Sequence, residues 1–290
     1  MNAKLTRTEF DALVEISENN TELSAQTAGT LPALEKAGYA AGGKITRKGL
    51  EALEPCRARR AVFMAAGFGS RMVPITLNTP KPLVRVKGQR LIDGLLDACI
   101  KAGIEEIYVV RGYLGEQFDQ LLYKYPMIKF IDNTLYNEAN NISSVLLAKD
   151  LLQNAYVFEA DLLLTNPGII KKYHYQSNFL AIKKDKTDDW CFEVENGIIT
   201  KEKVAGEDCW QMVGISYWNA EDGASLSKHL AQAYDQPGGH DLYWEQVPLV
   251  VFKDEYKVEV RGCTDEDIVE IDTFDELKQI DTIYDVKKEG

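Results

Sequence analysis

The fold is decided by residues 61–84, which have the sequence AVFMAAGFGSRMVPITLNTPKPLV. The stretch begins with an apolar run, residues 61–66, which has the length and composition of a short buried strand. Gly67 and Gly69 follow, and glycines let a backbone bend tightly and approach a ligand closely. The backbone N–H groups of such a turn are donors for an anion. These residues therefore predict a strand that leads into an anion-binding turn.

Two cations, Arg71 and Lys81, stand in the loop after the turn. Their side chains suit a ligand with several phosphate groups. Three prolines restrict the backbone around them, so that both cations would be held in place: Pro74, Pro80 and Pro82. An ordinary strand-to-helix turn with solvated basic residues would explain any one of these residues by itself. The complete spacing, G-x-G-x-R-x-x-P-x-T followed by P-K-P, favours phosphate binding.

Size and composition are typical of a soluble globular protein. The chain has 290 residues, 45% of them hydrophobic and 27% charged, which allows one main domain and a smaller appendage. No run approaches the roughly 20 apolar residues of a membrane span, and the polar N-terminal segment does not resemble a signal peptide. Five scattered cysteines without a C-x-x-C pair predict reduced thiols in the cytoplasm and argue against structural zinc. The net charge of −12 argues against nucleic-acid binding.

A small winged-helix-like module is predicted over residues 1–57, and the main domain over residues 58–290. The module would begin with a helix after Thr6, with Glu9 completing a capping box. A second helix, a hairpin turn at Gly42-Gly43 and a third helix would follow. Within this module, the stretch from Asn20 to Leu34 is too short to hold both a support helix and a DNA-recognition helix comfortably. We therefore expect a remnant without DNA binding, and a ligand-sensing DNA-binding regulator is the alternative.

Strands and helices alternate from residue 61 onward, which predicts a mostly parallel, Rossmann-like α/β sheet in three layers, with helices on both faces. Strands are expected at 61–66, 107–111, 128–131, 156–160, 179–183, 190–195, 198–204, 210–218, 258–260 and 268–271. Helices are expected at 91–102, 115–124, 142–151, 220–234, 240–249 and 274–283. The strand at 156–160 would deliver Glu159 and Asp161 to its carboxyl end, where open α/β sheets bind ligands.

Two better-known nucleotide motifs do not fit. The third glycine of a G-x-G-x-x-G dinucleotide fingerprint is replaced by Met72. Residues 38–44 match the start of a P-loop, but Ile45 stands where the hydroxyl for Mg²⁺ is required, and no buried strand precedes the segment. That segment is interpreted as a hairpin turn.

The glycine loop resembles the signature of the nucleotidyltransferases that activate sugar phosphates and alcohol phosphates with an NTP. The resemblance covers about residues 60–285 and implies that residues 58–290 are the catalytic domain. In this family the glycine turn wraps the nucleotide, and the loop's arginine and lysine contact its phosphates. The implied catalytic residues are Arg71 and Lys81. The implied nucleotide-binding residues are Ala66, Gly67, Gly69 and Ser70.

A narrower resemblance rests on six short segments that occur in one order. They are Asn140-Asn141, Glu159-Ala-Asp161, Asp189-Trp190, Gly214-Ile-Ser-Tyr-Trp218, Asp241-Leu-Tyr-Trp244 and Glu270-Ile-Asp272. Together they resemble the bacterial CTP:phosphocholine cytidylyltransferases. The resemblance implies transfer of CMP from CTP to phosphocholine, giving CDP-choline and pyrophosphate.

The same resemblance implies Mg²⁺ held by Asp161 and Asp272. Mg²⁺ usually takes one or two protein carboxylates, with phosphates and waters completing its shell. Either aspartate could instead cap a helix. Glu159 stands where the family's motif often has aspartate, so it is left outside the predicted ligand set. Asn140 and Asn141 are predicted to face the nucleotide, and simple helix caps are the alternative.

The acceptor site is predicted in the second half of the chain. A quaternary ammonium is held by aromatic faces and nearby carboxylates. Trp190 and Tyr243 are the predicted cage, with Asp241 and Glu270 as the negative field, although core packing is the commoner fate of such rings. Lys183 would steady the acceptor's phosphate. The alternative acceptors are 2-aminoethylphosphonate, phosphoethanolamine or a sugar phosphate, and the sequence does not indicate an oligomeric state.

Overall fold

The computed structural model describes residues 5–18 and 22–285. Its contacts divide the chain into two compact units, one of residues 1–57 with 172–175 and one of residues 58–171 with 176–290. They are called unit 1 and unit 2 below. That either unit is a domain that folds by itself stays a prediction.

Unit 1 has the predicted order of helix, helix, hairpin and helix. Its elements are α1 (Arg7–Ser17), α2 (Ala25–Lys36), β1 (Ala40–Ala41), β2 (Lys44–Ile45), α3 (Arg47–Leu53) and the 3₁₀ turn η1 (Glu54–Cys56). The capping box is confirmed, because Thr6 Oγ1 accepts from the Glu9 N–H and Glu9 Oε2 accepts from the Thr6 N–H. The predicted turn at Gly42-Gly43 joins β1 to β2. The likeness to a winged helix stays a prediction.

The core of unit 1 includes a segment from much later in the chain. Tyr173 is buried among Leu13, Leu34 and Leu53. Tyr175 packs on Phe10 with 5.4 Å between ring centroids. The backbone N–H of residue 174 donates to the carbonyl of residue 56 at 2.8 Å. Residues 172–175 therefore complete a core that the first 57 residues do not complete by themselves.

Unit 2 is built on a seven-stranded sheet with the order β10-β12-β11-β8-β3-β6-β7. Its strands are β3 (Arg60–Ala65), β6 (Glu106–Arg111), β7 (Ile128–Asp132), β8 (Ala155–Glu159), β10 (Asn178–Glu195), β11 (Ile198–Trp218) and β12 (Glu259–Cys263). The strand β3 lies between β6 and β8 and is parallel to both, while β11 runs antiparallel to β8. The prediction of a mostly parallel sheet is confirmed.

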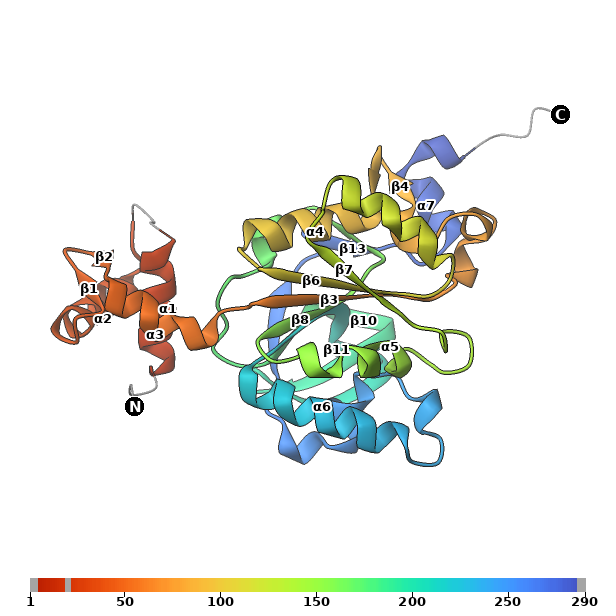
Figure 1. Cartoon of the computed structure of the whole chain (residues 1–290). Coiled ribbons are helices and arrows are strands. Elements are labelled where there is room, and N and C mark those ends of the chain that lie inside the picture. Colours follow the sequence, from red (N-terminus) through yellow and green to blue (C-terminus); the bar gives the residue numbers. More distant parts are fainter. Residues whose placement is uncertain (1–4, 19–21, 286–290) are drawn as a thin grey trace. The chain divides into compact units, whose positions relative to one another are not determined.

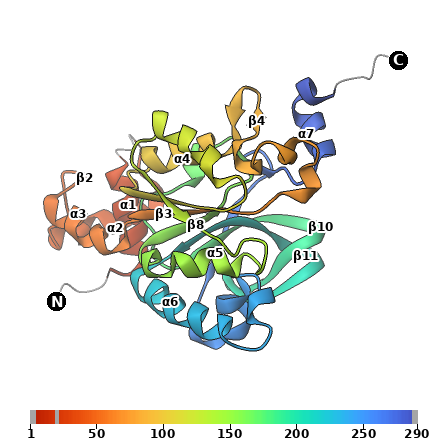
Figure 2. The same cartoon turned by 45° about the vertical axis from the view of Figure 1, so that its right-hand side comes forward.

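Alternation along β3 gives the sheet two buried faces. Ala61 and Phe63 point into one apolar core, and Val62 between them points into another. The first face is covered by α4 (Leu91–Lys101) and the second by α5 (Ile142–Leu147) and α6 (Ala220–Tyr234), as Figures 1 and 2 show. The three-layer prediction is therefore confirmed.

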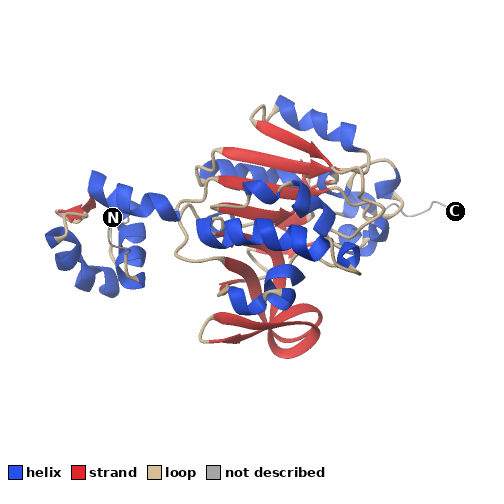
Figure 3. Ribbon diagram, turned by 60° about the horizontal axis from the view of Figure 1, so that its bottom comes forward, coloured by secondary structure: helices blue, strands red, loops and turns tan. Residues whose placement is uncertain are grey.

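The expected four strands between residues 179 and 218 are two long strands. β10 and β11 form one hairpin that curls below the main sheet (Figure 3). The turn between them contains Asn196 and Gly197 with φ of 51° and 81°, as an Asn-Gly hairpin turn requires. The hairpin bends so far that Cys191 pairs with both Lys203 and Gln211. Residues between the expected strands are paired across the hairpin as well, for example Lys186 with Glu207.

Other helices differ from the expectation. Residues 240–249 do not form one helix but a 3₁₀ turn, η8 (Gly239–Asp241), and a π-turn, η9 (Val247–Val251). Pro248 lies within η9 and cannot donate a helical hydrogen bond. The remaining 3₁₀ turns are η2 (Ser70–Met72), η3 (Ile75–Leu77), η4 (Lys81–Leu83), η5 (Gly115–Tyr123), η6 (Lys149–Leu151), η7 (Pro167–Ile169), η10 (Lys253–Glu255) and η11 (Thr282–Tyr284).

The last elements of unit 2 are short. A small ribbon is formed by β4 (Arg85–Val86) and β5 (Gln89–Arg90), and α7 (Phe274–Ile280) follows the late strand β13 (Ile268–Glu270). β13 does not join the main sheet but pairs antiparallel with β9 (Leu162–Leu164). Within residues 5–18 and 22–285, no helix is long and apolar enough to cross a membrane.

Candidate active site

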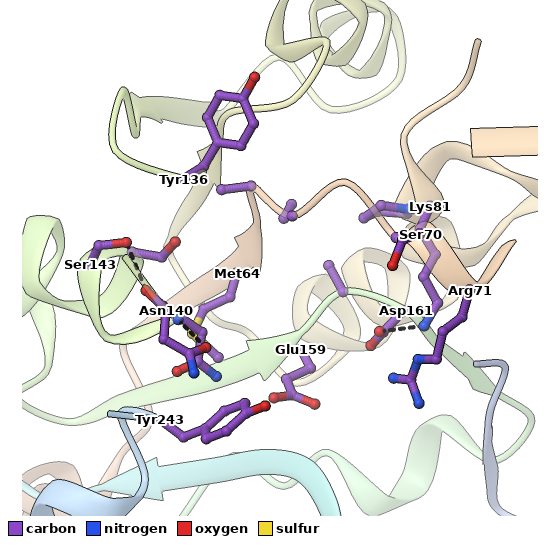
Figure 4. A pocket seen from close by; sticks show the side chains of 18 of the residues that line it. Met64, Ser70, Arg71, Lys81, Tyr136, Asn140, Ser143, Glu159, Asp161 and Tyr243 are labelled. Atoms are coloured by element: carbon purple, nitrogen blue, oxygen red, sulfur yellow. Dashed lines mark hydrogen bonds and ion pairs between the residues drawn. The ribbon is translucent and has the colours of Figure 1, made fainter. Parts of the chain in front are cut away.

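A cavity of about 500 Å³ opens where β3 and β8 end, in unit 2. Figure 4 shows its side chains, which come from the glycine loop on one side and from β8 and the segment around Tyr243 on the other. Twelve predicted site residues line it. They are Ala66, Gly67, Gly69, Ser70, Arg71, Lys81, Asn140, Asn141, Asp161, Tyr243, Glu270 and Asp272. The structure thus brings together residues more than 200 positions apart in the sequence.

The two glycines of the loop differ in backbone conformation and in the space around them. Gly69 has a φ of 67°, and a Cβ there would lie 3.1 Å from the Cβ of Lys81. The loop therefore needs glycine at this position for its own conformation. A Cβ on Gly67 would meet nothing within 4 Å. The fold leaves the space beside Gly67 open toward the cavity that this residue lines.

Lys81 is the best-buried cation of the site, with 7% of its surface exposed. Its Nζ lies 2.8 Å from Asp161 Oδ2 and 3.1 Å from Asp272 Oδ1. Burial opposes the charge, but the two carboxylates outweigh it and raise the pKa of Lys81. Arg71 also donates to Asp272 Oδ1, at 2.7 Å, and most of its side chain stays exposed. The site therefore holds one fixed cation and one that extends toward solvent.

Three carboxylates gather beside Lys81. Oxygen atoms of Glu159, Asp161 and Glu270 lie within 4.8 Å of one another. Glu270 reaches this position because β13 pairs with β9 and places it opposite Leu162, directly after Asp161. Burial, followed by the charges of Asp161 and Glu270, raises the pKa of Glu159. Burial and the neighbouring aspartates likewise raise the pKa of Glu270 to about 9.

The carboxylate cluster fits a divalent cation. Asp161 Oδ1 is buried and accepts no hydrogen bond from any residue that the structure describes. A buried acceptor without a donor is costly, and hard cations such as Mg²⁺ prefer carboxylate oxygen. Asp161 was predicted as a ligand, whereas Glu159 was left out and Glu270 was assigned to the acceptor. Asp272 lies outside the cluster and bonds the two cations, so its role as a metal ligand stays a prediction.

The sequence contained a signal for Glu159, which the predicted ligand set omitted. Within residues 58–290 the pattern Glu-x-Asp occurs twice, at 159–161 and at 270–272. The two copies lie at the ends of paired structure, at the β8–β9 turn and at the end of β13. Gly214 on β11 makes room for the first copy, because a Cβ there would collide with Glu159 Oε2. The residues around position 159 therefore leave room for a glutamate side chain, which is longer than that of aspartate.

The predicted acceptor residues fall into two groups. Tyr243 and Glu270 line the cavity, and in Figure 4 the Tyr243 ring points toward Glu159. Trp190 does not line the cavity, but its ring packs against Tyr243 with 5.4 Å between centroids. Asp241 is exposed outside the lining, and its carbonyl accepts from Asn140 Nδ2 at 3.1 Å.

Lys183 is also outside the lining. Its Nζ lies 2.7 Å from Asp208 Oδ1 and 5.7 Å from the centroid of the Trp210 ring. The curl of the β10–β11 hairpin sets this direction. The predicted phosphate contact of Lys183 is not tested by the structure, and the geometry does not favour it.

Asn140 and Asn141 connect α5 to the segment before η9. Asn140 Oδ1 accepts from the Asn141 N–H at 2.7 Å, and Asn141 Oδ1 accepts from the Trp244 N–H at 2.8 Å. Both residues line the cavity. They thus have a structural role, and their predicted contact with the nucleotide stays a prediction.

Known proteins share both the sequence and the fold of unit 2. Residues 60–198 match the model of the family described as Nucleotidyl transferase. The 2-aminoethylphosphonate cytidylyltransferase of Lancefieldella rimae is 37% identical over 228 residues, which cover 77% of this chain and 92% of that protein. This chain belongs to the nucleotidyl transferase family.

Other relatives within this family are cytidylyltransferases too. The choline-phosphate cytidylyltransferase of Streptococcus pneumoniae is 30% identical over 77% of this chain and 97% of that protein. The solved structure of the CTP:phosphocholine cytidylyltransferase from Streptococcus pneumoniae superposes with a TM-score of 0.72 at 30% identity, covering 78% of this chain and 99% of that one. The present family member is accordingly an enzyme with cytidylyltransferase activity.

Proposed function

We propose that this cytidylyltransferase transfers CMP from CTP to a small zwitterion that carries an ammonium group and a phosphonate or phosphate, with 2-aminoethylphosphonate as the first candidate. One observation carries the proposal. The lining of one cavity combines two cations, Lys81 and Arg71, with two carboxylates and an aromatic ring, those of Glu159, Glu270 and Tyr243. The named acceptor of the 37% identical relative is a molecule of this kind.

Phosphocholine is the second candidate. The Trp190–Tyr243 pair favours it, because aromatic faces attract a trimethylammonium group that cannot donate hydrogen bonds. The relatives named for choline phosphate are 30% and 29% identical to this chain. Trp190 packs on Tyr243 but does not line the cavity, which supports the primary amine over phosphocholine.

The proposed reaction is a direct displacement. An anionic oxygen of the acceptor donates an electron pair to the α-phosphorus of CTP, and the bond to the β-phosphate breaks, so that pyrophosphate leaves with its electron pair. The oxygen is already ionised near neutral pH, so no general base is required. The chain's task is therefore to position the two anions and to neutralise their charge.

The residues that line the cavity share that task. Lys81, fixed between Asp161 and Asp272, would hold phosphate oxygens at a defined place, and Arg71 would fold onto the pyrophosphate from solvent. The turn at Gly67 and Gly69 would give its N–H groups to the nucleotide. Mg²⁺ held by Glu159, Asp161 and Glu270 would supply further positive charge to the phosphates of CTP.

The test is pyrophosphate release from each NTP with each acceptor, in the presence of Mg²⁺. The expected result is turnover with CTP and 2-aminoethylphosphonate, and a lower kcat/KM with phosphocholine or a sugar phosphate. Lys81→Met should lower kcat by about 10²–10³-fold, the usual loss for a fixed electrostatic contact. The matched control is Lys183→Met, which removes a lysine outside the cavity and should keep nearly normal kinetics.

Two results would contradict the proposal. Absence of pyrophosphate release with CTP and every aminoalkyl phosphate or phosphonate would reject the acceptor class. An equal loss in Lys81→Met and Lys183→Met would mean that the cavity is not the place of reaction.

A further inference from the structure

The curled hairpin of β10 and β11 brings together two of the chain's five cysteines. Cys191 on β10 has 0% of its surface exposed, and Cys209 on β11 has 2%. A Cβ on Gly206 would lie 2.9 Å from Cys191 Sγ and 3.1 Å from Cys209 Sγ. Since both sulfur atoms lie within about 3 Å of one point, they are at most about 6 Å apart. The two thiols thus share one small space, which a side chain at position 206 would fill.

The strand register explains why the cysteines meet. Cys191 pairs with Gln211, and side chains two positions apart on a strand point to the same face of a sheet. Cys209 therefore lies diagonally opposite Cys191 on one face. In a flat hairpin Cys191 would lie opposite Lys203 alone, six residues before Cys209. The contact between the cysteines is thus made by the curl of the hairpin (Figure 3).

The backbone that passes over the thiols is exposed and locally unfavourable. Residues 204, 205, 207 and 208 are all exposed. Ala205 and Asp208 have φ of 61° and 47°, a left-handed conformation that is unfavourable for residues other than glycine. Exposed segments with few buried contacts open locally at low cost. A small oxidant can therefore reach the cysteines without unfolding of unit 2.

Opening of this segment would also make Cys191 reactive. Burial raises the pKa of Cys191 and the neighbouring Cys209 raises it further, whereas Lys203 lowers it. Lys203 Cε would lie 2.9 Å from a Cβ on Gly206, so its side chain shares the same space. The thiolate is the reactive form of a cysteine, and a neighbouring lysine favours it. Exposure to water removes the burial and leaves the lysine.

Cys191 follows a residue that supports an aromatic ring of the cavity. The Trp190 ring packs on the Tyr243 ring with 5.4 Å between centroids, and Tyr243 lines the cavity. Asp189 Oδ1 accepts from the Trp190 N–H at 2.7 Å, and Asp189 Oδ2 accepts from Gln211 Nε2 at 3.3 Å. Gln211 is in turn the residue paired with Cys191. One short piece of the hairpin therefore carries the thiol and holds the tryptophan.

We propose that Cys191 and Cys209 are a redox modification site and form a reversible disulfide that weakens acceptor binding. Trp190 packs on Tyr243 while both thiols are free. A disulfide holds its sulfur atoms about 2.0 Å apart, so it draws residue 191 toward residue 209 and shifts Trp190 relative to Tyr243. The effect on the acceptor rests on the proposed function, whereas formation of the disulfide does not depend on it.

The oxidant in this proposal is hydrogen peroxide. The Cys191 thiolate attacks one peroxide oxygen, the O–O bond breaks, and hydroxide leaves a sulfenic acid on Cys191. The Cys209 sulfur then attacks the sulfenic sulfur, the S–O bond breaks, and the hydroxyl group leaves as water with the Cys209 proton. The two thiols lose two electrons in total, and peroxide is reduced to two waters. A dithiol reverses the reaction by thiol–disulfide exchange.

The first test needs no variant. The folded full-length protein is treated with hydrogen peroxide, its remaining thiols are blocked, and it is digested without reduction. Mass spectrometry should find the peptides of Cys191 and Cys209 joined, with two hydrogen atoms fewer than the separate thiol forms. Dithiothreitol should separate them. Cys191→Ser and Cys209→Ser should each lose the link, and the matched control Cys56→Ser, which removes a thiol of unit 1, should retain it.

The second test compares the kinetics of the reduced and the linked enzyme. With CTP at saturation, KM for 2-aminoethylphosphonate should rise about 2–10-fold on oxidation, the size expected for loss of one aromatic pair. KM for CTP should change less than about twofold, and dithiothreitol should restore the first value. Peroxide should leave the acceptor KM of Cys209→Ser unchanged and should raise that of Cys56→Ser as it does in the wild type.

Three results would overturn the proposal in whole or in part. Sulfenic or sulfinic acid at either cysteine without the link, or a link that forms only in urea, would reject the disulfide. Equal acceptor KM values in the reduced and the linked wild type would reject its effect on binding. These outcomes are distinct from failure of the proposed function. If no aminoalkyl acceptor supports pyrophosphate release, the proposed function falls, and the mass spectrum still decides whether the disulfide forms.

Discussion

Gly69 and Gly67 of the glycine loop are expected to serve different purposes, the first the fold and the second ligand binding. Gly69 has a positive φ and sits against Lys81, whereas Gly67 has open space beside it. We therefore expect Gly69→Ala to lower the free energy of unfolding by about 1–2 kcal/mol and to disturb Lys81. We expect Gly67→Ala to leave stability unchanged and to raise KM for CTP, because its methyl group would occupy nucleotide space. Thermal melts and steady-state kinetics on both variants measure this difference.

The control for the glycine pair is Gly29→Ala in α2. No atom lies within 4 Å of a Cβ at that position, and Gly29 belongs to unit 1. It should change neither KM nor kcat. If Gly67→Ala binds CTP as well as the wild type does, the nucleotide does not approach this turn.

At the residue scale, the sequence predicted site residues best where the local backbone or a charge requires a particular residue type. Gly67, Gly69, Lys81 and Asp161 lie in one cavity as expected. Lys183 does not, because the direction of its side chain depends on the curl of a long hairpin rather than on the simple alternation of a strand. Glu159 was left out because the family's motif often has aspartate at its position, and Gly214, which makes room for it, is distant in sequence.

The start of α7 fixes the backbone of a site residue. Glu276 Oε2 accepts from the N–H groups of Asp272, at 2.7 Å, and Thr273, at 2.9 Å. Thr273 Oγ1 in turn accepts from the Glu276 N–H. This capping box therefore holds both a helix terminus and the aspartate that bonds Lys81 and Arg71.

Replacing the capping carboxylate should affect stability a little and activity more. Glu276→Ala should lower the free energy of unfolding by about 1 kcal/mol, the usual effect of a lost cap. It should also lower kcat, because Asp272 loses the bond that sets its backbone. Urea melts and pyrophosphate assays measure the two effects, with Asp275→Ala as the control because that neighbouring side chain is 81% exposed. A normal kcat in a destabilised Glu276→Ala would show that Asp272 needs no such support.

Among the elements, strands with buried neighbours on both sides were predicted within a residue or two, for example β3 and β8. Their apolar runs are a property of the segment itself. The segment around Tyr243 was predicted as a helix and is not one. Its backbone is held from outside, since Asn141 accepts from the Trp244 N–H and the carbonyl of residue 240 accepts from Asn140. Bonds of this kind are not visible in a local pattern.

Glu202, a buried acid on β11, gives the whole molecule a pH-dependent stability. Burial, followed by the charge of Glu245, raises the pKa of Glu202 from 4.5 to about 8. Between these values the folded chain retains a proton that the unfolded chain has released. The stabilisation is therefore complete below about pH 4.5 and is lost as the pH rises through about 8.

The free energy of unfolding should thus fall between about pH 5 and about pH 8, with up to about 4 kcal/mol of the fall due to Glu202. Glu202→Gln should flatten this part of the curve, since an amide does not titrate in this range. Denaturant melts at several pH values measure the slope. Glu207→Gln, which removes an exposed carboxylate, should retain it, and an unchanged slope in Glu202→Gln would place the titrating group elsewhere.

The segment at residues 172–175 has a consequence for how the molecule is made. A ribosome delivers the chain from its N-terminus, and N-terminal domains generally fold as they emerge. The core of unit 1 is not yet complete at that stage, because Tyr173 and Tyr175 are synthesised more than a hundred residues after α3. At roughly 5–20 residues per second, helices α1 to α3 must wait several seconds for the tyrosines that complete their core. Unit 1, which precedes unit 2 in the chain, is thus completed only after four of the seven strands of the unit 2 sheet have been synthesised.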